Sequence, residues 1–283
     1  MLSKIFAAAR FDLTRALRPG RVAIVFVLAM FPPSIAMITT VNGAYILAPI
    51  VIGVTTMMVG VLALLLWATP VVYSEMEGKT WTYISVRPQG KVSLLLGKYL
   101  MAVVWAICVC FLAMSVAVVV TESLHANLDE ATTQKLDPPV ETNPENPNAG
   151  QPVELPTAFD IWWVYTILIG LAAFAYAALF LLFGVIFHRR SMVLAVAYII
   201  FCEFGVAFVP AIVNKITIQH HLTGLAVKWL GVEALVGEEF IESMGIAEPP
   251  WQNVAFLVAI PLLVMGGTIF LIRNGEYITA DEN

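Results

Sequence analysis

The sequence predicts an all-α membrane protein with six transmembrane helices, an N-terminal amphipathic helix at the membrane interface, and both termini in the cytoplasm. Hydrophobic residues form 60% of the 283-residue chain and charged residues 12%, with a mean hydropathy of +0.86. Water-soluble domains of this length do not normally reach such values. Six stretches are long and apolar enough to cross a bilayer, which takes about 20 residues. We therefore expect a single transmembrane domain over residues 1–283.

Residues 1–20 have the pattern of an amphipathic helix. On a helical wheel, Lys4, Arg15 and Arg18 fall on the polar side. The opposite, apolar face is formed by Leu2, Ile5, Phe6, Ala9, Leu13 and Leu17. A basic amphipathic helix before the first span is expected to lie in the inner interface of the membrane. The alternative is a secretory signal that is cleaved before Asn42.

Six apolar segments are the candidate transmembrane spans. The first contains the pair Pro32-Pro33, which a neighbouring helix can accommodate. The fourth and fifth are separated only by a polar turn, His188 to Ser191, which predicts a tight hairpin. An even number of spans places both termini on the same side of the membrane. The spans cover approximately residues 22–41, 49–72, 96–120, 159–187, 191–213 and 252–272.

Basic residues identify the cytoplasmic side, because Lys and Arg accumulate in cytoplasmic segments. Twelve of the fifteen lie before the first span, between spans two and three, after span four or after span six. The opposite side holds Lys135, Lys215 and Lys228. Both termini and the loop between spans two and three are therefore expected in the cytoplasm. The chain would be a multi-pass protein of the inner (cytoplasmic) membrane.

The two long outer segments differ in composition. Between Thr121 and Asp160 there are eight acidic residues, one Lys and six prolines. Such a composition cannot bury enough apolar surface to order the chain, so residues 121–158 are expected to form a mobile extracytoplasmic loop. This loop is either a solvated linker or a collector of cations. Residues 214–251 are apolar with recurring glutamates, and predict short extracytoplasmic helices that form either an outer gate or a packed cap.

Two short motifs suggest an enzyme at first sight, and neither is complete. Gly78-Lys79-Thr80 resembles the end of a phosphate-binding loop, but Tyr73 stands where that loop requires a Gly. The glutamates around Glu238 lack the partner His, Cys or acidic pair of an intramembrane protease. We therefore expect no catalytic residue and no nucleotide-binding site in this chain, and no nucleic-acid partner.

Cysteine and histidine do not form a recognisable metal-binding pattern. Cys108, Cys110 and Cys202 all fall within predicted spans, and no full set of metal ligands accompanies them in the sequence. We expect these cysteines to be small core residues rather than ligands. The pair His220-His221 is expected to be a polar feature of the outer helices. No metal or cofactor is predicted.

Glu203 stands near the middle of span five. An unpaired carboxylate at the bilayer centre costs at least ~2.5 kcal/mol, so such groups usually face a cavity or a partner. Glu203 is therefore a candidate residue of a pathway for substrate or protons, and in that case Glu203→Gln would impair transport without unfolding the protein. The alternative is a protonated Glu203 that is hydrogen-bonded across a helix interface.

A charged island, Tyr73–Met101, separates spans two and three, and residues 73–95 form its loop. Thr80 to Val86 can form a short amphipathic helix with aromatic residues on its surface. An aromatic and basic protrusion of this kind is suited to docking a partner. The alternative is a hairpin end that is anchored by interfacial aromatics. The candidate partner-binding residues are Glu75, Glu77, Gly78, Thr80, Trp81, Tyr83, Arg87, Pro88, Lys91, Gly97 and Lys98.

The pattern Glu75-x-Glu77-Gly78-x-Thr80, Ser85-x-x-Pro88, Lys91 and Gly97-Lys98 resembles the signature after the second span of permease subunits in the type-2 ATP-binding cassette (ABC) exporter class. The layout of entry helix, six spans and inner termini is similar over the whole chain. In that family the loop contains the coupling helix, which binds in a cleft of the ATPase subunit. The resemblance implies that Thr80 to Val86 is the coupling helix, with Glu75 and Glu77 as its acidic hinge and Gly97-Lys98 as the inner start of span three.

The resemblance further implies a permease subunit of an ATP-driven ABC transporter, expected to be an exporter, with a separate ATPase subunit. Two such chains, or one with a related permease, would form the translocation pathway as a dimer surrounded by membrane lipid. Two other classes stay open: an ion-coupled secondary transporter or channel that uses Glu203, and a scaffold that only anchors partners. Secondary transporters often contain inverted repeats, and spans 1–3 and 4–6 show no internal similarity. The few polar groups in the spans slightly favour a hydrophobic or amphiphilic substrate.

Overall fold

The computed structural model describes residues 2–17, 19–41, 48–77, 80–87, 89–127, 157–187, 189–205, 214–232 and 248–275. Every regular element within these ranges is a helix, which confirms the all-α prediction. Five helical stretches are long and apolar enough to cross a membrane: Val22–Thr39, Val51–Glu77, Gly90–Ser123, Phe159–Ile186 and Pro250–Asn274. The chain is therefore a multi-pass integral membrane protein.

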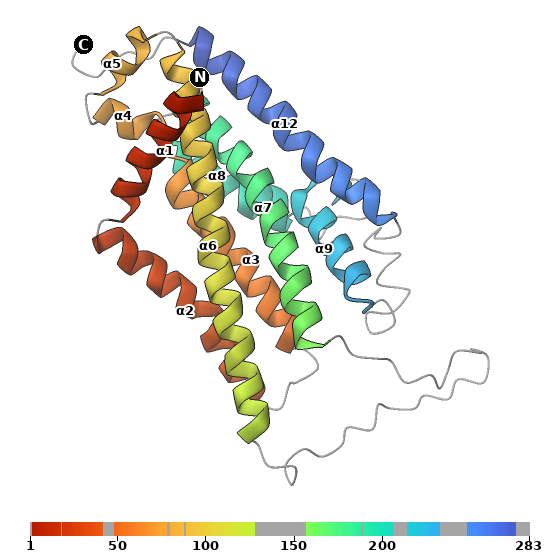
Figure 1. Ribbon diagram of the computed structural model, residues 1–283. Coiled ribbons are helices and arrows are strands. Elements are labelled where there is room, and N and C mark those ends of the chain that lie inside the picture. The colour runs from red at the N-terminus through yellow and green to blue at the C-terminus, as the bar shows by residue number, and fades with distance from the viewer. Residues whose placement is uncertain are drawn as a thin grey trace.

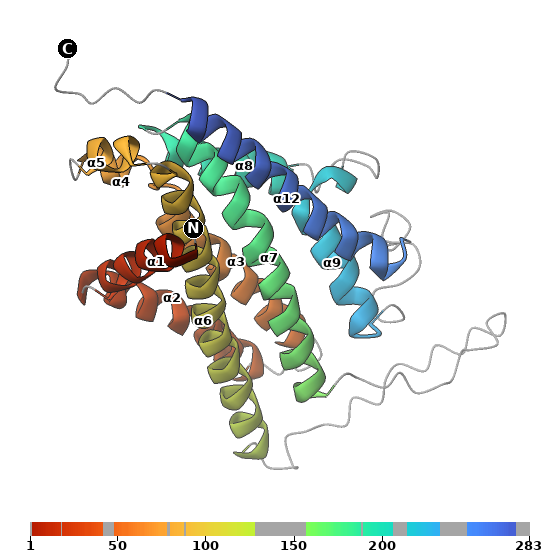
Figure 2. The ribbon, with the colours of Figure 1, turned by 45° about the horizontal axis from the view of Figure 1, so that its top comes forward.

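The first part of the chain contains the predicted entry helix and two spans. Helix α1 covers Leu2–Ala16, α2 covers Pro19–Val41 and continues through Pro32 and Pro33, and α3 covers Ala48–Ala68. Helix α1 packs on α6, and α2 packs on both α3 and α6. Figure 2 shows α1 crossing the side of α6.

The island contains two short helices, α4 (Tyr73–Glu77) and α5 (Trp81–Val86), followed by the long helix α6 (Gly90–Asn127). Helix α6 begins six residues before the predicted span. Its start is set by a turn in which Gln89 has a φ of 62°. A Cβ atom at position 90 would lie 2.2 Å from the carbonyl oxygen of Ile84, so this close approach requires Gly90.

Helix α6 also extends past its predicted outer end. The expected loop from residue 121 is helical up to Asn127, and the hydroxyls of Thr121 and Ser123 donate to carbonyl oxygens one turn earlier. These hydrogen bonds allow polar residues to continue a helix beyond the apolar stretch. Residues 128–156, which include most of the predicted acidic loop, lie outside the described part of the chain.

Helix α7 (Ala158–Ile186) is the central helix of the bundle. A capping box between Thr157 and Asp160 closes its N-terminus. It packs against α3, α6 and α12. Within its apolar stretch, 61% of the residues are buried, compared with 22% in the first span. Hydrogen bonds from Tyr99 to the carbonyl oxygen of Phe174 and from Trp162 to Ser115 join α6 and α7. The interior of the protein therefore lies around α7.

The fifth predicted span, 191–213, is described only as far as Gly205. It consists of α8 (Ser191–Tyr198) and a π-helical segment, η1 (Ile199–Gly205), and residues 206–213 lie outside the described ranges. The outer segment 214–251 is described at its two ends, where it contains the 3-10 turn η2 (Asn214–Ile216) and α9 (Ile218–Trp229). Helix α12 (Pro250–Asn274) is the last described helix.

The helices place the island and the outer segment at different ends of the bundle. In Figure 1, α4 and α5 lie where α6 begins and α12 ends, whereas α9 lies beside the N-terminal half of α12. Seven of the twelve residues of α9 are buried, and α9 packs against both α7 and α12. Of the two interpretations of the outer segment, this packing supports a cap on the bundle.

Candidate functional site

A buried ion pair lies at the centre of the island. The Nζ atom of Lys98 on α6 lies 2.7 Å from Oε1 of Glu75 on α4, and only 6% and 3% of the two side chains are exposed. The same ammonium donates to the carbonyl oxygen of Val71 at 3.0 Å and to Oγ of Ser74 at 2.8 Å. Lys98 therefore has an acceptor for each of its three protons, which is the condition under which a buried charge is tolerated.

Thr80 completes the network on the other side of Glu75. Its backbone N–H donates to the carbonyl oxygen of Glu75 at 3.0 Å, and its hydroxyl donates to Oε2 of the same residue. Thr80 is thereby joined to Glu75 of α4, which in turn pairs with Lys98 of α6. Three residues of the predicted signature, Glu75, Thr80 and Lys98, thus meet in one buried cluster.

The two aromatic residues of α5 lie in different surroundings. Tyr83 is 75% exposed and Val86 81%, but Trp81 is only 3% exposed. The expectation that both aromatic residues lie on the surface is therefore wrong for Trp81. Residues two positions apart on a helix point to nearly opposite sides, so a helix of six residues that lies on the bundle must bury one of them.

Lys91 points into the protein. Its Nζ atom lies 6.0 Å from the centre of the Trp81 ring, within the range of a cation–π contact. The same atom donates a hydrogen bond of 2.8 Å to the carbonyl oxygen of Gly275, at the end of α12. Lys91 therefore connects α5, α6 and the last helix.

Gly97 allows α1 to approach α6. A Cβ atom at this position would lie 2.7 Å from Cβ of Ala8 and 3.0 Å from the carbonyl oxygen of Ile5. Both distances are shorter than ordinary contacts between side-chain and backbone atoms, and backbone atoms cannot move aside cheaply. The signature glycine is thus explained by close packing of the entry helix.

An open cleft of about 440 Å³ lies between α1, α5 and the start of α6. Clefts that bind ligands or partner side chains commonly have volumes of roughly 300–1,000 Å³. The walls of the cleft include Glu75 and Arg87. The other lining residues are Ala7, Ala8, Phe11, Thr80, Tyr83, Ile84, Gly90, Ser93 and Leu94.

The remaining predicted island residues do not enter the buried cluster. Glu77 and Arg87 are exposed. Gly78 and Pro88 lie outside the described residues. Sequence reasoning missed Ser74 and the carbonyl oxygen of Gly275 as partners of the two lysines, because neither stands out in a local pattern.

Glu203 lies in the π-helical segment η1 and is 3% exposed. Its Oε1 accepts a hydrogen bond of 2.7 Å from the Tyr198 hydroxyl. The backbone N–H groups of Ile218 and Gln219 donate to Oε1 at 3.4 Å and to Oε2 at 3.0 Å. The carboxylate thus occupies the N-terminus of α9, where free N–H groups and the helix dipole favour negative charge.

A second polar cluster joins α9 to α12. Nδ1 of His221 lies 2.7 Å from Oδ1 of Asn253, and its Nε2 lies 2.9 Å from the carbonyl oxygen of Lys215. The His221 ring stacks on Phe256 with centroids 3.9 Å apart. The predicted polar role of the histidine pair corresponds to this contact, while its partner Asn253 was not foreseen.

Charged groups surround the neighbouring His220, which lies outside the five candidate spans. Burial lowers the pKa of His220, and the charges of His221 and Lys215 lower it further, while Glu248 opposes the shift. A salt bridge of 2.8 Å joins Lys215 to Glu248, and the hydrogen bond from Lys215 lowers the pKa of Glu248. At neutral pH this cluster therefore contains a neutral His220 beside a charged pair.

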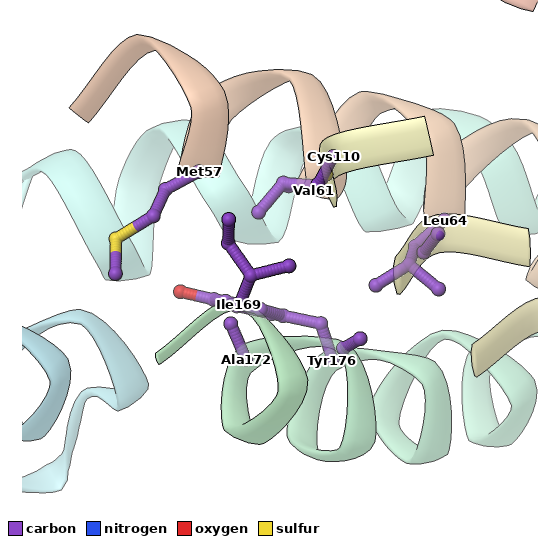
Figure 3. Close-up of a pocket in the computed structure, with 10 residues that line it drawn as sticks. Met57, Val61, Leu64, Cys110, Ile169, Ala172 and Tyr176 are labelled. Atoms are coloured by element: carbon purple, nitrogen blue, oxygen red, sulfur yellow. The ribbon is translucent and has the colours of Figure 1, made fainter. Parts of the chain in front are cut away.

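The interior between α3, α6 and α7 contains a small apolar void. Figure 3 shows Met57 and Leu64 of α3 facing Ala172 and Tyr176 of α7, with Cys110 from α6 beside them. The volume is about 10 Å³, close to the minimum for one water molecule. This void is too small for a transported molecule.

The three cysteines differ in their exposure. Cys110 is buried and lies 3.6 Å from the carbonyl oxygen of Thr56, as expected for a small core residue. Cys108 and Cys202 are exposed on the surface of their helices, so the prediction of core positions is wrong for these two. Helix faces that contact lipid accept a thiol as readily as a packed interior does.

A comparison with protein-family models identifies the first part of the chain. Residues 18–136 match the family model described as ABC-2 family transporter protein. The matched region contains the first three predicted spans and the whole island, and it supports an ABC-2 type permease. No curated protein matches the chain.

Proposed function

We propose that this chain, with its ABC-2 transporter region, is the permease subunit of an ATP-driven exporter and docks a separate ATPase subunit through α5. In this proposal the ATPase hydrolyses ATP and the chain itself catalyses no reaction. Membrane subunits of this family generally work with an ATPase partner, and the match over residues 18–136 supports the same arrangement here.

The observation that carries the proposal is the contrast within the island. Tyr83 and Val86 are exposed, and Tyr83 also lines the open cleft, whereas Glu75, Trp81 and Lys98 are buried. A surface that receives mechanical force needs exposed anchor residues and a rigid attachment to the rest of the molecule. The exposed face of α5 supplies the first, and the buried Lys98–Glu75–Thr80 network supplies the second.

The proposed topology has six spans, with the island and both termini in the cytoplasm of the inner membrane. Two observations support this orientation. Exposed basic residues cluster at the island end, namely Arg87, Arg189, Arg190 and Arg273. The C-terminal end of α7 also lies there, because a Cβ atom at Gly184 would lie 2.4 Å from the carbonyl oxygen of Thr69. In this topology the fifth span, which is not among the five long apolar helices, is the segment that begins with α8 and η1.

We place the translocation pathway between two permease chains, either identical or related. The described interior around α7 is packed, and the void in Figure 3 holds at most about one water molecule. In contrast, only 22% of the residues in the apolar stretch of α2, and 28% of those in the apolar stretch of α12, are buried. Their free faces are available to lipid and to a second chain.

The contacts of Glu203 favour a structural role over an ion-coupled transporter. Both carboxylate oxygens are already occupied, by the Tyr198 hydroxyl and by the N–H groups that begin α9. A residue that binds and releases a coupling ion must give up such contacts in every cycle. We therefore propose that Glu203 holds the cap, α9, in place.

Affinity purification from native membranes tests the docking proposal. The wild-type chain should co-purify with a protein that contains a phosphate-binding loop and hydrolyses ATP. Tyr83→Asp and Val86→Asp should each abolish this co-purification, because they place a charge in the docking surface. Trp251→Ala, which changes a side chain that is 68% exposed at the other end of α12, is the matched control.

Two results would contradict the proposal. One is retention of the ATPase by both α5 variants while their yield and elution volume match the wild type. The other is transport by the purified chain, without any ATPase, that is driven by a proton or sodium gradient.

A further inference from the structure

Lys91 makes a direct contact between the island and the last helix. Its ammonium lies between the Trp81 ring on α5 and the carbonyl oxygen of Gly275, 184 residues later in the chain. The hydrogen bond to Gly275 measures 2.8 Å. Trp81 is buried, so the contact lies beneath the exposed face of α5 and not within it.

The end of α12 is a suitable place for a lysine. The last carbonyl groups of a helix have no partner within the helix, and the helix dipole makes this end negative. Gly275 is the C-cap of α12 and leaves the helical conformation, with φ −74° and ψ 132°. Its carbonyl oxygen therefore turns to the side, where Lys91 meets it. A cation at this point stabilises the end of the helix and fixes its position against α5 and α6.

Helix α12 has no extensive packing against α4 or α5, the two short helices of the island. It packs mainly against α7, and beyond that against α9 and α6. Only 28% of the residues in its apolar stretch are buried, so much of the helix surface is exposed. A polar contact at the end of such a helix has a large influence on where that end lies.

We propose that Lys91 is a positioning residue that makes the last helix, α12, follow the island when α5 moves. This inference builds on the proposed docking role of α5. Force on α5 then reaches the bundle by two routes, each through a lysine of α6. Lys98 connects to α4 and to the turn at Val71, and Lys91 connects to α12. Lys91 lies seven residues before Lys98, so both lysines lie on the same side of α6.

Distances between spin labels in the full-length chain, reconstituted in lipid nanodiscs, test this proposal. One label is attached through Val86→Cys on α5 and the other through Phe270→Cys in the last turns of α12, both highly exposed positions. The exposed Cys108 and Cys202 are replaced by Ser, and the buried Cys110 is kept. The wild-type lysine should give one narrow distance distribution.

Removal of the ammonium is compared with its conservative replacement. Lys91→Met should lose the narrow distribution, because the end of α12 is released from α5. Lys91→Arg should retain it, because a guanidinium also donates to a carbonyl oxygen and stacks on an aromatic ring. Arg273→Met, which removes an exposed cation from the same end of α12, is the matched control and should change nothing.

An unchanged distribution in Lys91→Met would overturn the proposal. A second label pair, Val119→Cys on α6 and Trp163→Cys on α7, reports whether the bundle itself is intact. If Lys91→Met disturbs that pair too, Lys91→Gln is compared with Lys91→Arg instead, and equal distributions in these two would overturn the proposal. The measurement needs no ATPase, so its outcome is independent of the purification experiment that tests docking.

Discussion

The polar network of the island and the polar network around α9 fix helices by different physical means. In the island, a full ion pair is buried between α4 and α6, with 6% and 3% of its side chains exposed. Around α9, the carboxylate of Glu203 meets a helix N-terminus, and the two side chains of the ion pair Lys215–Glu248 are 44% and 24% exposed. The first network depends on two charges that neutralise each other out of water. The second depends on hydrogen bonds to a helix N-terminus and on a partly exposed ion pair.

This difference matches what each end has to do in the proposed function. A buried ion pair that is broken on one side leaves an uncompensated charge, so it resists separation strongly. Such a network suits the place where force enters. Contacts between a carboxylate and backbone N–H groups, or between His221 and Asn253, cost less to break. The cap can therefore separate from the bundle at a smaller cost than the island can.

The largest effect is expected from breaking the island pair on one side. Lys98→Met or Glu75→Gln should each destabilise the folded chain by about 3–5 kcal/mol, because the remaining group is buried with its main partner lost. The double variant should recover a large part of that loss. Unfolding in detergent, followed by circular dichroism, gives the free energies. Glu77→Gln, at an exposed position on the same short helix, is the control.

Equal stability of the single variants and the wild type would show that the pair is not buried as described. A double variant that is as unstable as the sum of the two single variants would show that the two charges do not interact. Either result would remove the contrast between the two networks.

A smaller effect is expected at Glu203. Glu203→Leu removes the acceptor for the N–H groups of Ile218 and Gln219, and a lost partner of this kind costs about 1–3 kcal/mol. Hydrogen exchange at the start of α9 should become faster, while exchange in α7 stays the same. Cys202→Ser, at the exposed neighbouring position, is the control. Loss of protection throughout the bundle would instead show that Glu203 supports the whole core.

Five of the six spans could be predicted from the sequence because they depend on the length of apolar runs, and the helix ends could not. Apolarity marks where the hydrocarbon core ends, whereas α6 begins where Gln89 and Gly90 form a turn and continues past the apolar stretch to Asn127. Helix α1 could be recognised from its period. The closeness of α1 to α6 at Gly97 depends on how two helices cross, which no local pattern contains.

The site was only half accessible to sequence reasoning. The spacing of Glu75, Thr80 and Lys98 located the island, but their meeting depends on the chain reversal through α4 and α5. The opposite directions of Trp81 and Tyr83 follow from helical geometry and could have been predicted from a spacing of two. The contacts Lys91–Gly275 and His221–Asn253 join segments 184 and 32 residues apart, and only the packing of α12 brings them together.

The smallest effect is expected from acidifying the outer cluster. Burial lowers the pKa of His220 below its ordinary value of about 6.5. The neutral ring therefore stabilises the folded arrangement above that pH, and this contribution is lost as the pH falls through the ordinary value and then through the lowered one. Positive charge on His220 would face Lys215 and His221, and among the described residues Glu248 opposes it. Acid should thus loosen α9 from α12, and leave the island, whose described contacts contain no His, in place.

Hydrogen exchange of α9, corrected for the intrinsic effect of pH, should show less protection at pH about 5 than at about 7.5. His220→Gln should remove this pH dependence, and a dependence that persists in that variant would assign the loosening to another group.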